Sequence, residues 1–136
     1  MMRFFCASLF LVFPVLLNAQ ADSASLANII RTSANNMMNA FKAGDFRTFV
    51  KYNNAALVTQ MGGEEEFTKY MEAEMKAMQG VEFREMRSGK ILRLLKNVQP
   101  MQCIIEQYSE LSVNNMPVSS VSHLIGVSAD SGKTWR

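Results

Sequence analysis

The chain has 136 residues, of which 49% are hydrophobic and 19% are charged, and its formal net charge is +2. This length gives one domain enough apolar material for a core and leaves no room for a second domain. Basic and acidic residues nearly balance and are scattered along the chain, which argues against nucleic acid or an anionic surface as partner.

The first 19 residues have the pattern of a secretory signal peptide. Arg3 is the lone cation, an apolar run follows from Phe4 to Leu17, and small and polar residues come next. A bilayer-spanning helix takes about 20 apolar residues, so the run is too short to be one. We therefore expect cleavage between Ala19 and Gln20. The remaining domain, residues 20–136, should be exported to the periplasm or secreted, with no membrane contact once the signal is removed.

Cleavage would remove Cys6 and leave Cys103 alone, so no internal disulfide is expected. Cys103 shares one face of its predicted strand with Met101 and Ile105, so its side chain is expected to point inward as a small apolar filler. A free thiol is usually buried. One histidine and one remaining cysteine do not make a closed zinc site. We expect no metal site and no cofactor.

Helices are predicted in the first half of the chain. Apolar residues recur at three- and four-residue spacing from Ser25 to Ala43, which predicts an amphipathic helix that Gly44 ends. Asp45 is expected to cap a short helix over 45–52. The pattern breaks over 53–63, and a third helix is predicted over 64–79, where three glutamates favour the helix N-terminus and lie on a solvated face.

Strands are predicted after Gly80. The segments 81–88, 90–96, 100–113 and 117–128 are separated by turn residues and indicate four strands in succession, although the second segment also fits a helix. A hairpin at 129–133 should lead to a short fifth strand from Thr134. Helices followed by antiparallel strands predict an α+β protein with the helices packed on one face of a curved sheet.

The last residues, "SADSGKTWR", follow the S-x-D-x-G-x-T-W pattern of the sialidase Asp-box, which is a hairpin device remote from the catalytic residues. A propeller needs about four to eight blades of four strands each, and this chain carries the box once. We interpret the segment as a tight hairpin. Asp130 should bond amides across the turn, Gly132 should take a positive φ, and Trp135 should pack across the strands.

Three stretches carry a wider resemblance: "GDFRTFVKYNNAALVTQMGGEEEFTKYMEAEM" after the first helix, then "MQCIIEQ", then "HLIGVSADSGKTW". Together they resemble small exported bacterial proteins of the nuclear transport factor 2-like superfamily, which includes the SnoaL-like proteins and has a cystatin-like cone. The resemblance implies three helices over a strongly bent antiparallel sheet of about four to five strands, with a pocket between them. Familiar members have a longer last strand, so a chain stopping at Arg136 would be truncated there.

That fold hosts isomerases, cyclases and proteins of no known activity, so function has to come from the residues. The isomerase-like members use a tyrosine on the first helix and buried carboxylates. Here the inward positions of the first helix are Leu, Ile, Met and Phe, and Asp45 is explained as a helix cap. His123 lies two residues from Val121 and from Ile125, so all three share one face of the predicted strand, and this apolar face is expected to be the concave one. There it would be either a proton-transfer group or a histidine bonded to a neighbour.

The residues expected in or near the pocket are Tyr52, Tyr70, Cys103, Gln107 and His123. Tyr108 is a further polar side chain, but alternation turns it outward. A Cys103–His123 pair is the one combination of nucleophile and base.

Three functional interpretations follow. The first is a noncatalytic exported domain whose largely apolar pocket binds a small apolar ligand or a protein partner, with methionines making the pocket adaptable. The second is an acid–base enzyme of the polyketide cyclase or ketosteroid isomerase sort that uses His123. The third is a structural module that forms a homodimer through the outer face of the sheet. An enzyme should aim at least three titratable or donor groups at one position in a cleft, which separates the first two interpretations.

Overall fold

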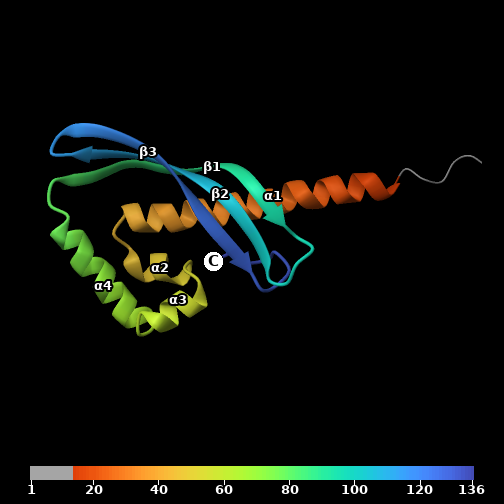
Figure 1. Ribbon diagram of the computed structural model, residues 1–136, viewed down its shortest axis with the longest axis horizontal. Helices are drawn as coiled ribbons and strands as arrows, with labels where there is room; N and C mark the ends of the chain where they lie inside the picture. Colours follow the sequence, from red (N-terminus) through yellow and green to blue (C-terminus); the bar gives the residue numbers. More distant parts are fainter. Residues whose placement is uncertain (1–13) are drawn as a thin grey trace, which may run out of the picture.

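A computed structural model describes residues 14–136, with side chains from Ser23 onward. The expected signal peptide, residues 1–19, lies outside the part whose side chains are described. The elements, in chain order, are α1 (Pro14–Lys42), α2 (Phe46–Lys51), α3 (Ala55–Gln60), α4 (Glu64–Ala77), β1 (Val81–Leu95), β2 (Met101–Val113) and β3 (Met116–Ser128). The strands form one antiparallel sheet in the order β1-β2-β3. Helix α1 runs along one face of the sheet and packs on β1, while α2 packs between α1 and α4 (Figure 1). The α+β prediction, with helices on one face of the sheet, is confirmed.

Local sequence explains where the helices begin and end. Gly44, at φ 72°, lies just beyond the end of α1. Asp45 then caps α2, because one of its carboxylate oxygens accepts a hydrogen bond from the Thr48 amide at 3.1 Å. Helix α3 was not predicted. Its local signal is Asn54, whose side-chain oxygen accepts a hydrogen bond from the Ala56 amide at 2.9 Å.

The sheet of the described residues has three strands rather than four or five. The segments predicted as two strands, 81–88 and 90–96, form the single strand β1, which continues through Gly89. A Cβ on Gly89 would lie 2.9 Å from Cβ of Glu106 on β2, and the Lys90 amide donates to that glutamate at 3.0 Å. Gly89 therefore allows close approach of β2 instead of breaking the strand. The pairing of β1 with β2 also shifts register at three places: between Phe83 and Glu85, between Ser88 and Ile91, and between Ile91 and Arg93. Such shifts mark β-bulges, which bend and twist a strand.

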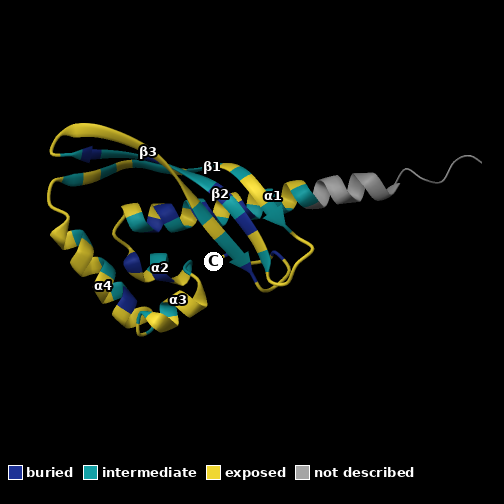
Figure 2. Ribbon diagram, viewed as in Figure 1, coloured by how far each residue is buried: buried dark blue, intermediate teal, exposed yellow. Residues whose placement is uncertain are grey.

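The core lies between α1 and the inner face of the sheet (Figure 2). Its buried members are Ile30, Ala34 and Met38 from α1, Cys103 and Ile105 from β2, and Trp135 from the C-terminal hairpin. The outer face of β3 is uncovered, since Val121 and Ile125 are 61% and 72% exposed. Among the described residues, no helix is long and apolar enough to cross a membrane.

Candidate ligand pocket

A cavity of about 550 Å³ lies between the helices and the inner face of the sheet. Helix α1 forms one wall, with α2 and the start of α3 beside it, and β2 and β3 supply most of the opposite wall. The apolar residues lining it are Ile30, Ala34, Met37, Met38, Phe41, Phe49, Leu57, Phe83, Met86, Cys103, Ile105, Leu111, Leu124, Ile125 and Trp135.

Trp135 closes one end of the pocket and is only 5% exposed. Its ring lies against Gly126 of β3, where an added Cβ would come within 3.2 Å of Cε3 of the indole and 2.7 Å of the Cys103 sulfur. The indole nitrogen donates to the Gly132 carbonyl oxygen at 3.1 Å. A glycine at position 126 is thus what allows both Trp135 and Cys103 to fit at this end of the pocket.

The C-terminal hairpin holds Trp135 in place. Asp130 accepts hydrogen bonds from the Thr134 amide at 2.9 Å, from the Thr134 hydroxyl at 2.7 Å and from the Ser128 hydroxyl at 2.8 Å. These bonds, those from Thr134 first, lower the pKa of Asp130 from 3.8 to about 2. Gly132 has φ 88°, as predicted, and its amide donates to the Ser128 hydroxyl. These hydrogen bonds and the positive φ of Gly132 confirm that the segment forms a tight hairpin.

The short fifth strand predicted from Thr134 is not formed within the described residues. Val127 and Arg136 exchange two backbone hydrogen bonds, at 2.8 and 3.0 Å, at the outer edge of β3. This single pair brings the chain back antiparallel to β3 and fixes Trp135 on the inner face.

The other end of the pocket is closed by aromatic rings. Phe41 of α1 lies 5.3 Å from Phe49 of α2 and 5.0 Å from Phe83 of β1, measured between ring centroids, and the latter pair is nearly perpendicular. Phe46 contacts the same ring from α2 at 5.9 Å. Edge-to-face contacts of this kind are favourable beyond the area they bury. The cluster ties α1, α2 and β1 together around the cavity.

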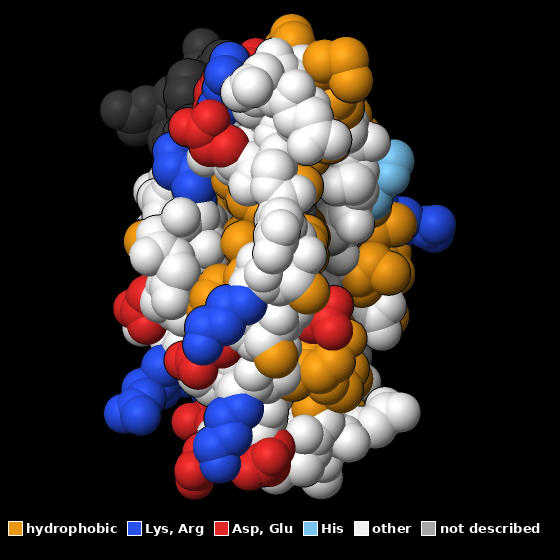
Figure 3. All heavy atoms as spheres, turned by 90° about the vertical axis from the view of Figure 1, so that its left-hand side faces the viewer, with side chains coloured by type: hydrophobic (Ala, Val, Ile, Leu, Met, Phe, Trp, Pro, Cys, Tyr) orange, Lys and Arg blue, Asp and Glu red, His pale blue; other side chains and the backbone are white. Residues whose placement is uncertain are grey.

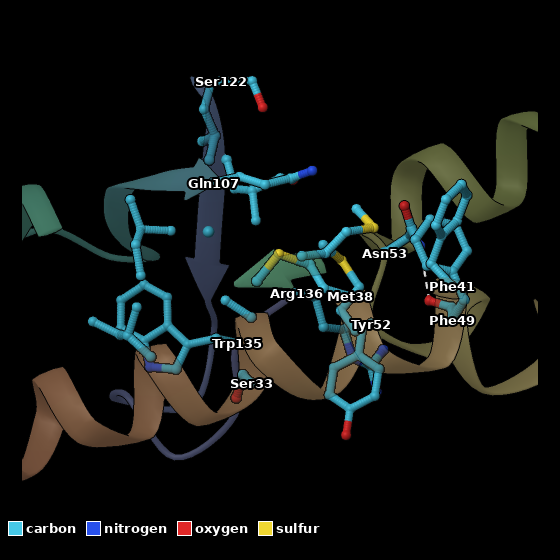
Figure 4. Close-up of a pocket in the computed structure, with 18 of the residues that line it drawn as sticks. Ser33, Met38, Phe41, Phe49, Tyr52, Asn53, Gln107, Ser122, Trp135 and Arg136 are labelled. Atoms are coloured by element: carbon cyan, nitrogen blue, oxygen red, sulfur yellow. Dashed lines mark hydrogen bonds between the residues drawn. The ribbon is translucent and has the colours of Figure 1, made fainter. Parts of the chain in front are cut away.

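A short polar strip crosses the sheet wall of the pocket. Gln107 of β2 is paired with Ser122 of β3, and Ser109 is paired with Ser120, so four neutral polar side chains form a block on the inner face. The Gln107 amide donates to the Ser109 hydroxyl at 3.3 Å. Figure 4 shows Gln107 and Ser122 on the sheet side of the cavity, with Tyr52 and Asn53 contributed from the helical side.

Three of the five residues predicted for the pocket line it: Tyr52, Cys103 and Gln107. Burial raises the pKa of the Cys103 thiol, and the Gly126 amide beside it acts in the opposite direction. Tyr70 lies elsewhere, on α4, and is 48% exposed. Helix α4 packs on α2 and α3 rather than on the sheet, which keeps Tyr70 away from the cavity.

His123 is not in the pocket, which corrects the predicted placement. It lies opposite Glu106 on the outer face of the sheet and is exposed, and the one histidine of the chain is visible at the surface in Figure 3. Alternation grouped it with Val121 and Ile125, which are 61% and 72% exposed, and of these three residues only Ile125 borders the pocket. The inward set contains Ser120 and Ser122 instead.

Cys103 faces the pocket and His123 lies on the outer face of the sheet, so the structure does not bring this predicted nucleophile and base together. Tyr108 faces outward, as predicted, and its ring lies beneath the guanidinium of Arg87 at 4.4 Å.

The described lining residues include one charged side chain, Arg136, and no carboxylate or histidine. Among the residues whose side chains are described, there is also no cluster of His, Cys, Asp and Glu that could hold a metal ion. Sequence reasoning missed the contribution of Ser33 from α1. Its signal was the helical spacing of the first helix, which places it near the inward face.

Comparison of the chain with family models, with curated proteins and with solved structures gives no match in any of the three.

Proposed function

We propose that this protein is a noncatalytic binding domain that takes a small, largely apolar ligand into the pocket between α1 and the sheet. The observation that carries the proposal is the lining: of the described residues around a cavity of about 550 Å³, most are apolar and only Arg136 is charged. Cavities of this size with apolar walls and a few polar groups are typical of small-molecule sites.

The polar strip suggests what the ligand carries. An apolar body would lie between Trp135 and the Phe41 cluster, and one neutral hydrogen-bonding group, such as a hydroxyl, carbonyl or amide, would meet Gln107 and the serines beside it. A charged group buried beside Gln107 and the serines would lose its hydration, which is costly, and the one charged lining residue, Arg136, is exposed to solvent rather than buried with them. The proposed ligand class is therefore an uncharged, mainly apolar molecule.

The acid–base interpretation depended on His123 as base. Its exposed position on the outer face of the sheet, opposite Glu106, leaves that mechanism without the group it required. The binding proposal needs no titratable group and agrees better with the pocket.

We also propose that the chain adopts the nuclear transport factor 2-like fold. A nuclear transport factor 2-like cone is supported by the order of helices before strands, by the bulges that bend β1, and by a pocket between α1 and the sheet. Export is proposed from the signal-like residues 1–19 alone. N-terminal sequencing of the exported protein should begin at Gln20, and recovery of intact Met1 from a membrane fraction would contradict this.

Ligand binding can be tested with Nile red, an uncharged apolar dye, because Trp135 lies in the pocket and is the only tryptophan of the chain. Binding should raise dye fluorescence and quench the emission of Trp135. Met37→Lys places a charge on the half-buried wall and should weaken dye binding at least tenfold. The matched control Asn36→Lys adds the same charge one residue away, at an exposed position, and should bind as the parent does.

Equal binding by both variants would place the dye outside this pocket and contradict the proposal. Native mass spectrometry of protein purified from its own source should in addition retain the natural ligand. Its mass and composition would identify the class directly.

A further inference from the structure

The pocket holds a buried hydroxyl group that can still donate a hydrogen bond. Ser109 of β2 is only 5% exposed, and apart from the bonded indole of Trp135 it is the one buried side chain with a nitrogen or oxygen atom among the described lining residues. Its oxygen accepts a hydrogen bond from the Gln107 amide at 3.3 Å, and no described residue accepts its proton. A serine hydroxyl both donates and accepts. Ser109 therefore presents an unpaired donor at the pocket wall.

Gln107 adds an acceptor beside this donor. The two residues are two positions apart on β2, so both side chains lie on the inner face of the sheet. One N–H of the Gln107 amide is bonded to Ser109, while its carbonyl oxygen accepts no hydrogen bond from any described residue. Turning the amide over would leave an N–H and the serine oxygen available instead. In both orientations the Gln107–Ser109 pair offers a donor and an acceptor.

The other polar side chains of the pocket are bonded, point elsewhere or lie in water. The Asn53 amide donates to the Phe49 carbonyl oxygen at 2.9 Å. Figure 4 shows the hydroxyl groups of Ser33 and Tyr52 directed away from Gln107. The remaining polar lining residues are exposed and can be hydrated: Asn54, Ser120, Ser122 and Arg136. The Gln107–Ser109 pair is therefore where a bound molecule has to supply a partner.

The pair lies between two apolar parts of the wall. Leu111 lines the cavity two positions after Ser109, toward the Phe41 cluster, and Cys103 lines it four positions before Gln107, toward the opposite end. At about 3.4 Å per residue, the wall continues for about 7 Å on the first side and about 13 Å on the second. A molecule that fills the pocket therefore has apolar parts on both sides of the group that meets the pair.

We propose that the ligand is an uncharged alcohol whose hydroxyl lies between two apolar parts, donates to the Gln107 carbonyl oxygen and accepts from the Ser109 hydroxyl. This inference rests on the proposed binding function and narrows its ligand class. A hydroxyl can do both from a single oxygen, which suits two protein groups only 3.3 Å apart.

Other neutral groups satisfy the pair less well. An apolar body lying over the pair excludes water, and a polar group then left without a partner is costly. A ketone or an ether only accepts, so the Gln107 oxygen would stay unpaired. The N–H and C=O of a trans secondary amide point in opposite directions and cannot both meet one site. A primary amide can do both, but it is a terminal group and has an apolar part on one side alone.

Three compounds that share two phenyl rings test the inference by displacement of Nile red. Benzhydrol carries a central hydroxyl that donates and accepts, benzophenone carries a carbonyl that only accepts, and diphenylmethane carries neither. Benzhydrol should displace the dye at a roughly tenfold lower concentration than benzophenone does. A cavity that responds to apolar surface alone would give the reverse order, because the hydroxyl is the most strongly hydrated of the three central groups.

A substitution at Gln107 tests the assigned acceptor. Gln107→Met has a side chain of similar length without the carboxamide, and it should bring the affinities for benzhydrol and benzophenone within about twofold of each other. The matched control is Gln102→Met, the same exchange at an exposed residue of β2 outside the pocket lining. This control should keep the preference of the parent for benzhydrol.

The result separates this inference from the proposed function. Nile red binding combined with equal affinities or the reverse order in the parent would overturn the alcohol assignment and leave ligand binding standing. An unchanged preference in Gln107→Met would overturn it in the same way. Failure of Nile red and of all three compounds to bind the parent would overturn both proposals. The ranking in the parent needs no variant, so the test does not depend on the folding of Gln107→Met.

Discussion

Asp130 and Thr134 are joined by two hydrogen bonds, because one carboxylate oxygen of Asp130 accepts from the Thr134 amide at 2.9 Å and the other from its hydroxyl at 2.7 Å. The loop that they close ends at Trp135, which forms one end of the pocket. A surface carboxylate therefore determines where an indole ring lies in the interior.

This relationship predicts a dependence of stability on pH. In the folded chain the pKa of Asp130 falls from 3.8 to about 2, so between these values the unfolded chain binds more protons than the folded chain. The free energy of unfolding should decrease as pH falls through this window, and the contribution of Asp130 should be fully present above it. Thermal unfolding followed by Trp135 fluorescence measures this.

Asp130→Asn is the control for that experiment. It keeps an oxygen that can accept from Thr134 but removes the titrating group, so its stability should change less than that of the parent over the same window. An identical pH profile in the parent and the variant would show that other carboxylates cause the acid sensitivity.

Asn35 predicts a second stability effect. Its side-chain oxygen accepts a hydrogen bond from the Ser88 amide at 2.8 Å, which links α1 to β1 where the strand is bulged. Asn35→Ala would leave that partly buried amide without its partner and should lower the free energy of unfolding by about 1–3 kcal/mol. Asn35→Asp keeps an acceptor and should lose less, as denaturant unfolding curves can show. Equal losses in the two variants would mean that the bond contributes little.

Cys103 should react slowly with thiol reagents in the folded protein. Only 2% of the residue is exposed, and burial raises the pKa of the thiol, which lowers the fraction present as the reactive thiolate. In a chain carrying Cys6→Ser, labelling by a disulfide reagent should be slow in buffer and prompt in denaturant. Ala129→Cys, introduced with Cys103→Ala, supplies an exposed thiol as the control. Labelling of Cys103 at the rate of that control would show that the pocket opens readily.

Features fixed by neighbouring residues could be predicted from sequence. The Asp45 cap and the Asp130 hairpin depend on amides within four residues, so residue types at fixed spacing were sufficient to locate them. Tyr52, Cys103 and Gln107, which were predicted in or near a pocket, line the cavity.

Features decided by distant contacts could not be predicted in this way. Alternation states which residues of a strand share a face but not which face the helices cover, and β3 turns Val121 outward and Ser122 inward. The error on His123 follows from assuming that the more apolar set is always buried. Gly89 similarly resembles a strand break until the side chain of Glu106 is seen beside it.

Gly126 gives the sharpest test of packing at the pocket end. A methyl group there would lie 2.7 Å from the Cys103 sulfur and 3.2 Å from the Trp135 ring, so Gly126→Ala should lower the free energy of unfolding by about 1–3 kcal/mol, as overpacking does. The sulfur is the nearer obstacle. Cys103→Ala removes it, and the double variant should therefore be more stable than the sum of the two single losses predicts. Denaturant unfolding of the four proteins completes the cycle. Strict additivity would mean that the methyl group is opposed by Trp135 alone, and an unchanged stability in Gly126→Ala would mean that the indole does not rest on this glycine.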